Sequence, residues 1–201
     1  MLRCGVLVSG RGSNLEALLQ AWSAGDLPVE FAVVASDRPG APAIAKARKY
    51  GVTTLELDPA AVGDRHAFFE RLITELDRHG VELVILAGFM RILPPEFLAH
   101  YRDRVINIHP SLLPAFPGLN AQRQALEYGV RYSGCTVHFV DEGVDSGPII
   151  AQAVVPVYAD DTEESLSQRI LQEEHRLLPA CIRLYATGRL RIIGRRVHIR
   201  R

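Results

Sequence analysis

The sequence predicts an α/β fold, namely a single-domain, Rossmann-like fold of three layers with a mostly parallel sheet, helices on both faces and a C-terminal antiparallel extension. Short β-branched runs alternate with helical patterns, which is typical of a parallel sheet covered by helices. The 201 residues, 48% of them hydrophobic, supply one core but are too few for two full domains. We expect one domain over residues 1–201, whose halves, about 1–100 and about 101–201, are not independent.

Five short runs are expected to form strands of the first half. They are rich in Val, Ile and Leu, and glycine, proline or polar residues bound them. The expected strands cover residues 4–9, 31–36, 53–57, 82–88 and 104–109.

Three helices are expected between these strands. In the first, apolar residues recur at helical spacing over 15–22, and Ser13 with Glu16 fits the pattern of a capping box. The other two cover 41–50 and about 68–79, and each is followed by a glycine that can end a helix.

The second half is less regular. A proline-rich segment at 109–120 leads to a short helix at 121–129 and to strands at 135–141 and 149–157. A second capping box, at Asp161 and Glu164, is expected to open a helix that runs to about Ala186, with a kink or break at Pro179. A terminal hairpin should turn near Gly194, with arginines that keep an exposed edge soluble.

Composition excludes several classes of protein. The formal net charge is zero, so no global field gathers nucleic acid onto the surface. The three cysteines lie far apart without a metal-binding or redox spacing, which favours a reducing cytoplasm. No apolar run approaches the roughly 20 residues of a membrane helix, and the N-terminus lacks a signal-peptide pattern. We therefore expect a cytoplasmic protein that binds neither nucleic acid nor membrane.

The loop SGRGSN joins the first strand to the first helix. Helix N-terminal N–H groups bind anions, and Gly10 and Gly12 allow a close approach to which Ser13 and Asn14 add donors. A dinucleotide fingerprint fits poorly, because its third glycine is missing and Asp37 compensates weakly. A monophosphate site is preferred, and an ordinary tight turn is the alternative.

Polar residues alternate along RVINIHP. In an extended strand Asn107 and His109 project from one face, and Pro110 ends the strand where open sheets bind ligands. An amide donor beside an imidazole suits a developing oxyanion, and Asp145, in a glycine-flanked loop, could favour the protonated imidazole. Capping and turn contacts are the alternative for these residues. His138, in an alternating strand, is interpreted as structural or supporting.

The segment LAGFMRILPPEF places apolar residues around one arginine. It fits either a slot for a flat aromatic ligand or ordinary core near a helix start.

Five motifs occur in a fixed order: SGRGSNL, LAGFMRIL, NIHPSLLPAFPG, RQALEYG and VDEGVDSGPII. Together, from Leu2 to about Glu174, they resemble the phosphoribosylglycinamide formyltransferases of the folate-dependent formyltransferase superfamily. The resemblance implies direct transfer of a formyl group from 10-formyltetrahydrofolate to the amine of glycinamide ribonucleotide, through an oxyanion and without a metal. The implied partners are these small molecules, and the oligomeric state, a homodimer included, is left open.

The resemblance also implies roles for particular residues. The implied catalytic residues are Asn107, His109 and Asp145. The implied ribonucleotide contacts are Gly12, Ser13, Asn14 and Glu174. The implied contacts to the folate are Arg65, Met90, Arg91, Ile92, Leu93, Asn107, Val140 and Asp141.

The chain departs from the family pattern at Asn120, where a histidine is usual, and near Leu171, where lysine or glutamine is common. Other formyl-folate enzymes, namely a 10-formyltetrahydrofolate hydrolase or a methionyl-tRNA formyltransferase, are alternatives. A non-catalytic nucleotide-binding domain is a third.

Overall fold

The computed structural model describes residues 1–200 and divides into two compact units. The first comprises residues 1–106 and the second begins at Asn107, so the boundary falls inside strand β5 (Val105–His109). The single-domain organisation stays a prediction.

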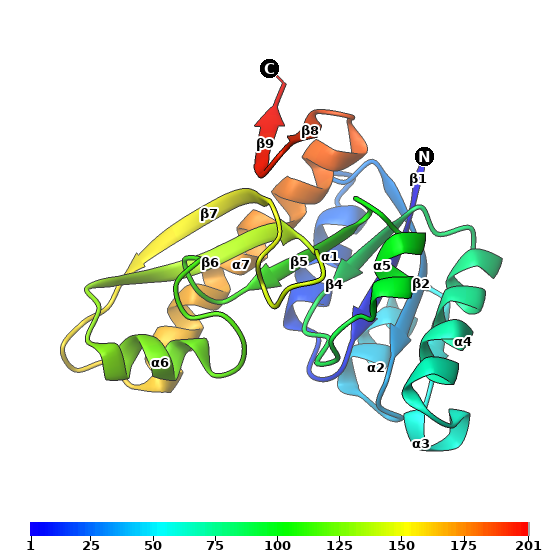
Figure 1. Ribbon diagram of the computed structural model, residues 1–201, viewed down its shortest axis with the longest axis horizontal. Coiled ribbons are helices and arrows are strands. Elements are labelled where there is room, and N and C mark those ends of the chain that lie inside the picture. The colour runs from blue at the N-terminus through cyan, green and yellow to red at the C-terminus, as the bar shows by residue number, and fades with distance from the viewer. Residues whose placement is uncertain (201) are drawn as a thin grey trace. The chain divides into compact units, whose positions relative to one another are not determined.

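The first unit contains four parallel strands in the order β3-β2-β1-β4. Figure 1 labels three of them, β1, β2 and β4. Their bounds are Leu2–Val8 for β1, Val29–Ser36 for β2, Thr54–Glu56 for β3 and Leu83–Leu86 for β4. The strands expected here are confirmed, with ends that differ by one or two residues. Both faces of the central strand β1 are buried, which explains its continuous apolar run.

Five helices connect these strands: α1 (Ser13–Ser23), α2 (Pro42–Lys49), α3 (Pro59–Val62), α4 (Arg65–Arg78) and α5 (Pro95–His100). The chain moves outward from β1 through β2 to β3 and then returns to the other side of β1 at β4. Because such crossovers are right-handed, this reversal places α1 and α2 on one face of the sheet and α3 to α5 on the other. The predicted parallel sheet with helices on both faces is therefore confirmed, whereas the short helices α3 and α5 were not predicted.

Helix α4 shows why these helices cover the sheet. Its apolar face, including Phe68, Phe69, Leu72 and Leu76, is fully buried. Phe69 packs edge to face on Phe68 and on Phe97 of α5, with ring centroids 5.2 and 6.0 Å apart. Burial of aromatic surface thus joins the two helices on this face.

The predicted capping box at the start of α1 is wrong. The N-cap is Gly12, in the left-handed conformation at φ 69°, so Ser13 is already helical. Glu16 pairs instead with Lys46, at 2.5 Å between Oε2 and Nζ. A Cβ at Gly12 would lie 2.5 Å from the Cβ of Ala43, so the tight approach of α2 requires glycine at the cap.

The second unit is built on an antiparallel pair, β6 (Tyr132–Phe139) and β7 (Ile149–Pro156). The long helix α7 (Glu163–Ala186) packs on both strands, and α6 (Ala121–Tyr128) packs on α7. The residues buried together between these elements are Ala125, Cys135, Val155, Val157, Leu166 and Ile170.

The predicted terminal hairpin is confirmed. Strands β8 (Leu190–Ile193) and β9 (Arg196–Ile199) are antiparallel and turn at Gly194. Strand β9 lies next to β7, in parallel, and β8 forms the edge. Antiparallel strands thus form the C-terminal extension, as expected.

The expected capping box of α7 is wrong, and of the kink or break expected at Pro179 the break does not occur. The capping box is formed by Thr162 and Ser165, one residue beyond the predicted pair, because the Asp161 carboxylate accepts hydrogen bonds from Ser165 Oγ and Arg169. The helix also continues through Pro179 without a break, since the apolar face around Pro179 is buried and compensates for one missing N–H. Among residues 1–200, no helix has the length and apolar character needed to cross a membrane.

Candidate active site

Strand β5 presents two polar side chains at its carboxyl end. Because side chains alternate along a strand, Ile106 and Ile108 are buried on one face and Asn107 and His109 project from the other. His109 is itself largely buried, with 5% of its surface exposed. Desolvation makes each interaction of this imidazole stronger than it would be in water.

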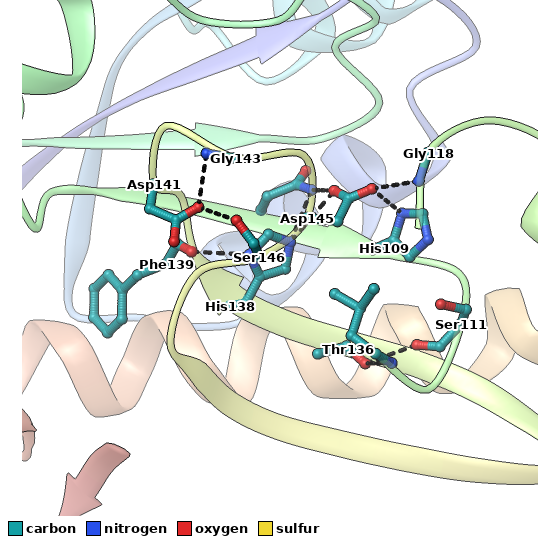
Figure 2. Close-up of polar contacts among 12 residues, drawn as sticks. His109, Ser111, Gly118, Thr136, His138, Phe139, Asp141, Gly143, Asp145 and Ser146 are labelled. Carbon is teal, nitrogen blue, oxygen red and sulfur yellow. Dashed lines mark hydrogen bonds and ion pairs between the residues drawn. The ribbon is translucent and has the colours of Figure 1, made fainter. Parts of the chain in front are cut away.

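Asp145 joins these two residues from the loop between β6 and β7 (Figure 2). Its Oδ2 lies 3.2 Å from His109 Nδ1 and accepts a 2.8 Å hydrogen bond from the Gly118 amide. Its Oδ1 lies 3.5 Å from Asn107 Nδ2. The structure therefore brings together the three residues that the sequence analysis selected as catalytic.

The loop around Asp145 is held by its own contacts. Asp145 has φ 51°, which is unfavourable for a residue with a side chain. Asp141 Oδ1 accepts hydrogen bonds from Ser146 Oγ at 2.5 Å and from the Gly143 amide at 3.2 Å (Figure 2). The Phe139 amide closes the base of the loop by donating to the Pro148 carbonyl. These contacts fix the backbone from which the Asp145 carboxylate projects.

Both ring nitrogens of His109 face hydrogen-bond acceptors. Nδ1 lies against the Asp145 carboxylate, and Nε2 lies 2.8 Å from the Phe116 carbonyl oxygen. Only the imidazolium can donate to both at once. Burial opposes this charge and lowers the pKa of His109 below its ordinary value, although the hydrogen bond to Phe116 and the charge of Asp145 each raise it. Asp145 therefore raises the pKa of His109, as expected, but burial lowers this pKa by more than Asp145 raises it.

Asp145 itself is held as a carboxylate. Burial alone would raise its pKa, but the contacts of the carboxylate with His138, with the Gly118 amide and with His109 together lower the pKa below the ordinary value. Asp145 is thus available as a permanent acceptor for His109.

His138 completes the cluster from β6. Its Nδ1 lies 2.8 Å from the Phe139 carbonyl oxygen and therefore donates the hydrogen of this contact. Its Nε2 then accepts from Asn107 Nδ2 at 3.2 Å and lies 3.7 Å from Asp145 Oδ1. This arrangement orients the Asn107 amide. Alternation in β6 indicated a supporting histidine, but nothing in the sequence specified these contacts.

The predicted anion site lies in the first unit. Gly12 caps α1, and Ser13 and Asn14 are its first residues, so their amides lie in the first turn, at the positive end of the helix dipole. The Gly10 carbonyl accepts a hydrogen bond from the Ala43 amide, which fixes the loop on α2. Lys46 neutralises Glu16, the one acidic residue in the first turn. The local charges are therefore compatible with an anion.

The segment implied to contact folate is also in the first unit. The Met90 amide donates to Ser9 Oγ at 2.9 Å, and Arg65 donates to the Ile92 carbonyl at 2.9 Å. The Met90 and Ile92 side chains are 58% and 63% exposed, whereas Leu93 is buried. Two of the implied folate contacts, Arg65 and Ile92, are thus adjacent, and the segment exposes apolar surface.

Two contacts hold the Arg91 side chain in place. Its Nε donates to Asp37 Oδ2 at 2.8 Å, and its guanidinium lies over the Phe68 ring at 5.2 Å. Asp37 is buried by this ion pair. The carboxylate that a dinucleotide site would use for a ribose is therefore already paired, which argues against that alternative.

The remaining implied residues lie in the second unit. Val140 and Asp141 begin the Asp145 loop, and Glu174 is buried on α7. Asn120, at the position where the family usually has histidine, is the left-handed N-cap of α6 at φ 57°. The substrate contacts of these residues stay predictions.

Cysteine chemistry is disfavoured. Burial raises the pKa of each of the thiols of Cys4, Cys135 and Cys181 to about 12, so none forms a thiolate near neutral pH. Among the described residues, no group of three or more His, Cys, Asp or Glu side chains is arranged to hold a metal ion.

The α/β fold places this polar cluster at the carboxyl end of β5, where open parallel sheets bind their ligands. Comparison with known proteins specifies the class, because the model of the formyl transferase family matches residues 2–182. The chain belongs to this family.

Three relatives illustrate the similarity. The phosphoribosylglycinamide formyltransferase of Escherichia coli is 44% identical over 93% of this chain and 88% of its own. That of Bacillus subtilis is 40% identical over 91% of this chain and 94% of its own. The crystal structure of glycinamide ribonucleotide transformylase 1 from Symbiobacterium toebii superposes with a TM-score of 0.98 at 56% identity, covering all of this chain and 95% of that one. The resemblance inferred from the five motifs is confirmed.

Proposed function

We propose that this chain transfers the formyl group of 10-formyltetrahydrofolate to the amine of glycinamide ribonucleotide, a step of de novo purine biosynthesis. The names of the relatives at 40 to 56% identity support this reaction. The observation that carries the proposal is the convergence of Asn107 and His109 on Asp145. His109 Nδ1 lies 3.2 Å from one carboxylate oxygen of Asp145, and Asn107 Nδ2 lies 3.5 Å from the other. Such a cluster provides the donors that acyl transfer requires.

The amine nitrogen attacks the formyl carbon, and the carbonyl electrons move onto oxygen to give a tetrahedral oxyanion. Asn107 Nδ2 gives up its 3.5 Å contact with Asp145 Oδ1 and donates that hydrogen to the oxyanion. The His109 imidazolium is the second donor, and each donor contributes about 3 kcal/mol in the transition state. Collapse of the oxyanion breaks the bond from carbon to the folate nitrogen. That nitrogen takes up the proton which the amine gives up, through water and Asp145.

The two states of His109 have separate uses in this reaction. Burial favours the neutral ring in the free protein, because it lowers the pKa of His109 below the ordinary value. A developing oxyanion raises that pKa, since a nearby negative charge favours the cation. If Nε2 is the donor to the oxyanion, it must exchange the Phe116 carbonyl for the formyl oxygen. As the negative charge appears, His109 takes up a proton from bulk water to form the imidazolium, and it returns this proton when the oxyanion collapses.

The remaining predicted residues bind the two substrates. Ribonucleotide contacts are assigned to the α1 N-terminus and to α7, namely Gly12, Ser13, Asn14 and Glu174. Folate contacts are assigned to Arg65, Met90, Arg91, Ile92, Leu93, Asn107, Val140 and Asp141. The exposed apolar side chains of Met90 and Ile92 support contact with a flat ring. Asp37 holds the guanidinium of Arg91 in one orientation.

The choice of acceptor tests the proposal. Purified protein is incubated with 10-formyltetrahydrofolate and either glycinamide ribonucleotide, methionyl-tRNA or water alone, and the formylated product and tetrahydrofolate are quantified. We expect one formylated ribonucleotide for each tetrahydrofolate released. The His109→Ala variant should remain folded but form the formylated ribonucleotide much more slowly. Formate as the main product would support a hydrolase. Ligand binding without formyl transfer to any acceptor would support a non-catalytic binding domain.

A further inference from the structure

The C-terminal hairpin makes contact with the loop that carries Asp145. Arg195, next to the Gly194 turn, donates a 2.7 Å hydrogen bond from Nη2 to the Ser146 carbonyl oxygen. One residue further along, Arg196 of β9 pairs with Ile149, the first residue of β7. Two consecutive residues of the hairpin, Arg195 and Arg196, therefore contact the end of this loop. The family match ends at residue 182, before the hairpin begins.

The anchored carbonyl directly follows Asp145 in the chain. Asp145 has an unfavourable backbone at φ 51°, and such a conformation persists only where its surroundings hold it. On one side the Ser146 side chain is bound to Asp141 at 2.5 Å. On the other side the Ser146 carbonyl is bound to Arg195. If the contact with Arg195 is lost, Ser146 keeps only the contact of its side chain with Asp141.

We propose that Arg195 is a positioning residue for formyl transfer, which keeps the Asp145 carboxylate against His109 by anchoring the Ser146 carbonyl. The proposal rests on the function proposed above. It differs from a purely solubilising role for the hairpin arginines, because a charged hydrogen bond to one carbonyl has a defined geometry, whereas solubility requires only charge. A displacement of about 1 Å in a reacting constellation can reduce turnover by a hundredfold, so an indirect anchor is sufficient to affect the rate.

The test compares Arg195→Ala with Arg191→Ala, which removes an exposed arginine from the edge strand β8 of the same hairpin. In Arg195→Ala we expect kcat to fall about tenfold, as for loss of one charge-assisted hydrogen bond, with an unchanged KM for the ribonucleotide. Its pH–rate profile should also shift to lower pH, because His109 loses part of the charge that raises its pKa. Arg195→Lys, which keeps a cationic donor, should restore most of the rate.

A second measurement does not depend on activity. Amide hydrogen exchange of residues 141–148 should accelerate in Arg195→Ala and stay at the wild-type rate in Arg191→Ala. Identical exchange, kcat and pH profile in the two alanine variants would overturn the proposal. If the wild-type protein transferred no formyl group, the proposed function would fail and with it the catalytic role of Arg195, while the exchange data would still decide whether Arg195 anchors the loop.

Discussion

Replacing Asp145 by asparagine keeps the shape of the side chain and removes its negative charge. The carboxylate lies 3.2 Å from His109 Nδ1, so its attraction for an imidazolium is about 5 kcal/mol at an effective dielectric constant of about 20. The same oxygen also accepts from the Gly118 amide, and that hydrogen bond can persist with the amide oxygen of asparagine. We therefore expect the transition state to lose about 3 kcal/mol of stabilisation in Asp145→Asn, which corresponds to a decrease in kcat of about a hundredfold.

Removal of the Asp145 charge should also shift the pH dependence of formyl transfer in a defined direction. A step that uses the imidazolium slows as pH rises through the His109 pKa, and Asp145 is one of the groups that raise this pKa. In Asp145→Asn this slowing should therefore begin at lower pH than in the wild type. Single-turnover formyl transfer across a pH series measures both effects. Asp26→Asn, the same change at an exposed position, is the control. A rate within twofold of the wild type, or a profile shifted to higher pH, would refute the reasoning.

Three further predictions concern stability and reactivity. Asp161→Ala should lower the free energy of unfolding by about 2 kcal/mol in urea titrations, since the carboxylate accepts two hydrogen bonds from Arg169. Because the pKa of Asp161 is depressed in the fold, this difference should be present near neutral pH and narrow as pH falls below about 4; a constant difference would contradict it. In the same urea titrations, Gly12→Ala should lower the free energy of unfolding by about 2 kcal/mol more than Gly25→Ala does. Both glycines have positive φ, but only Gly12 lies against Ala43. Equal decreases in the free energy of unfolding would contradict this explanation. The three buried cysteines should resist iodoacetamide at neutral pH and react after unfolding in urea, as mass spectrometry can show, and rapid labelling of the native protein would be inconsistent with their raised pKa values.

The sequence predicted the strands well, because their signal is local. Alternation over 104–109 was sufficient to place Asn107 and His109 on one face, and Pro110 marked the end of the strand. Continuous apolar runs such as β1 reflect burial on both faces of a parallel sheet.

Helix caps were predicted less well, because tertiary contacts decide them. Gly12 caps α1 since Ala43 leaves no room for a side chain, and Asp161 binds Arg169 instead of capping α7. Ala43 is distant from Gly12 in sequence, and Arg169 lies eight residues after Asp161, beyond the span of a capping box. A local pattern cannot distinguish between neighbouring candidates in such cases.

The partners within the site were the least predictable from residues alone. Asp145 meets His109 across 36 residues, and the glycine-flanked loop around Asp145 indicated only that such an approach was possible. The tautomer of His138, the contact of His109 with the Phe116 carbonyl and the anchor from Arg195 all depend on loop conformation. Loop conformation is set by long-range hydrogen bonds that leave no periodic signal.

A double-mutant cycle on formyl transfer tests most directly whether His109 and Asp145 act as one unit. Single-turnover rates are compared for the wild type, His109→Ala, Asp145→Asn and the double variant. If Asp145 acts through the imidazole, the double variant should be no slower than His109→Ala within about twofold. Multiplication of the two single effects in the double variant would contradict the account, because the two residues would then contribute independently.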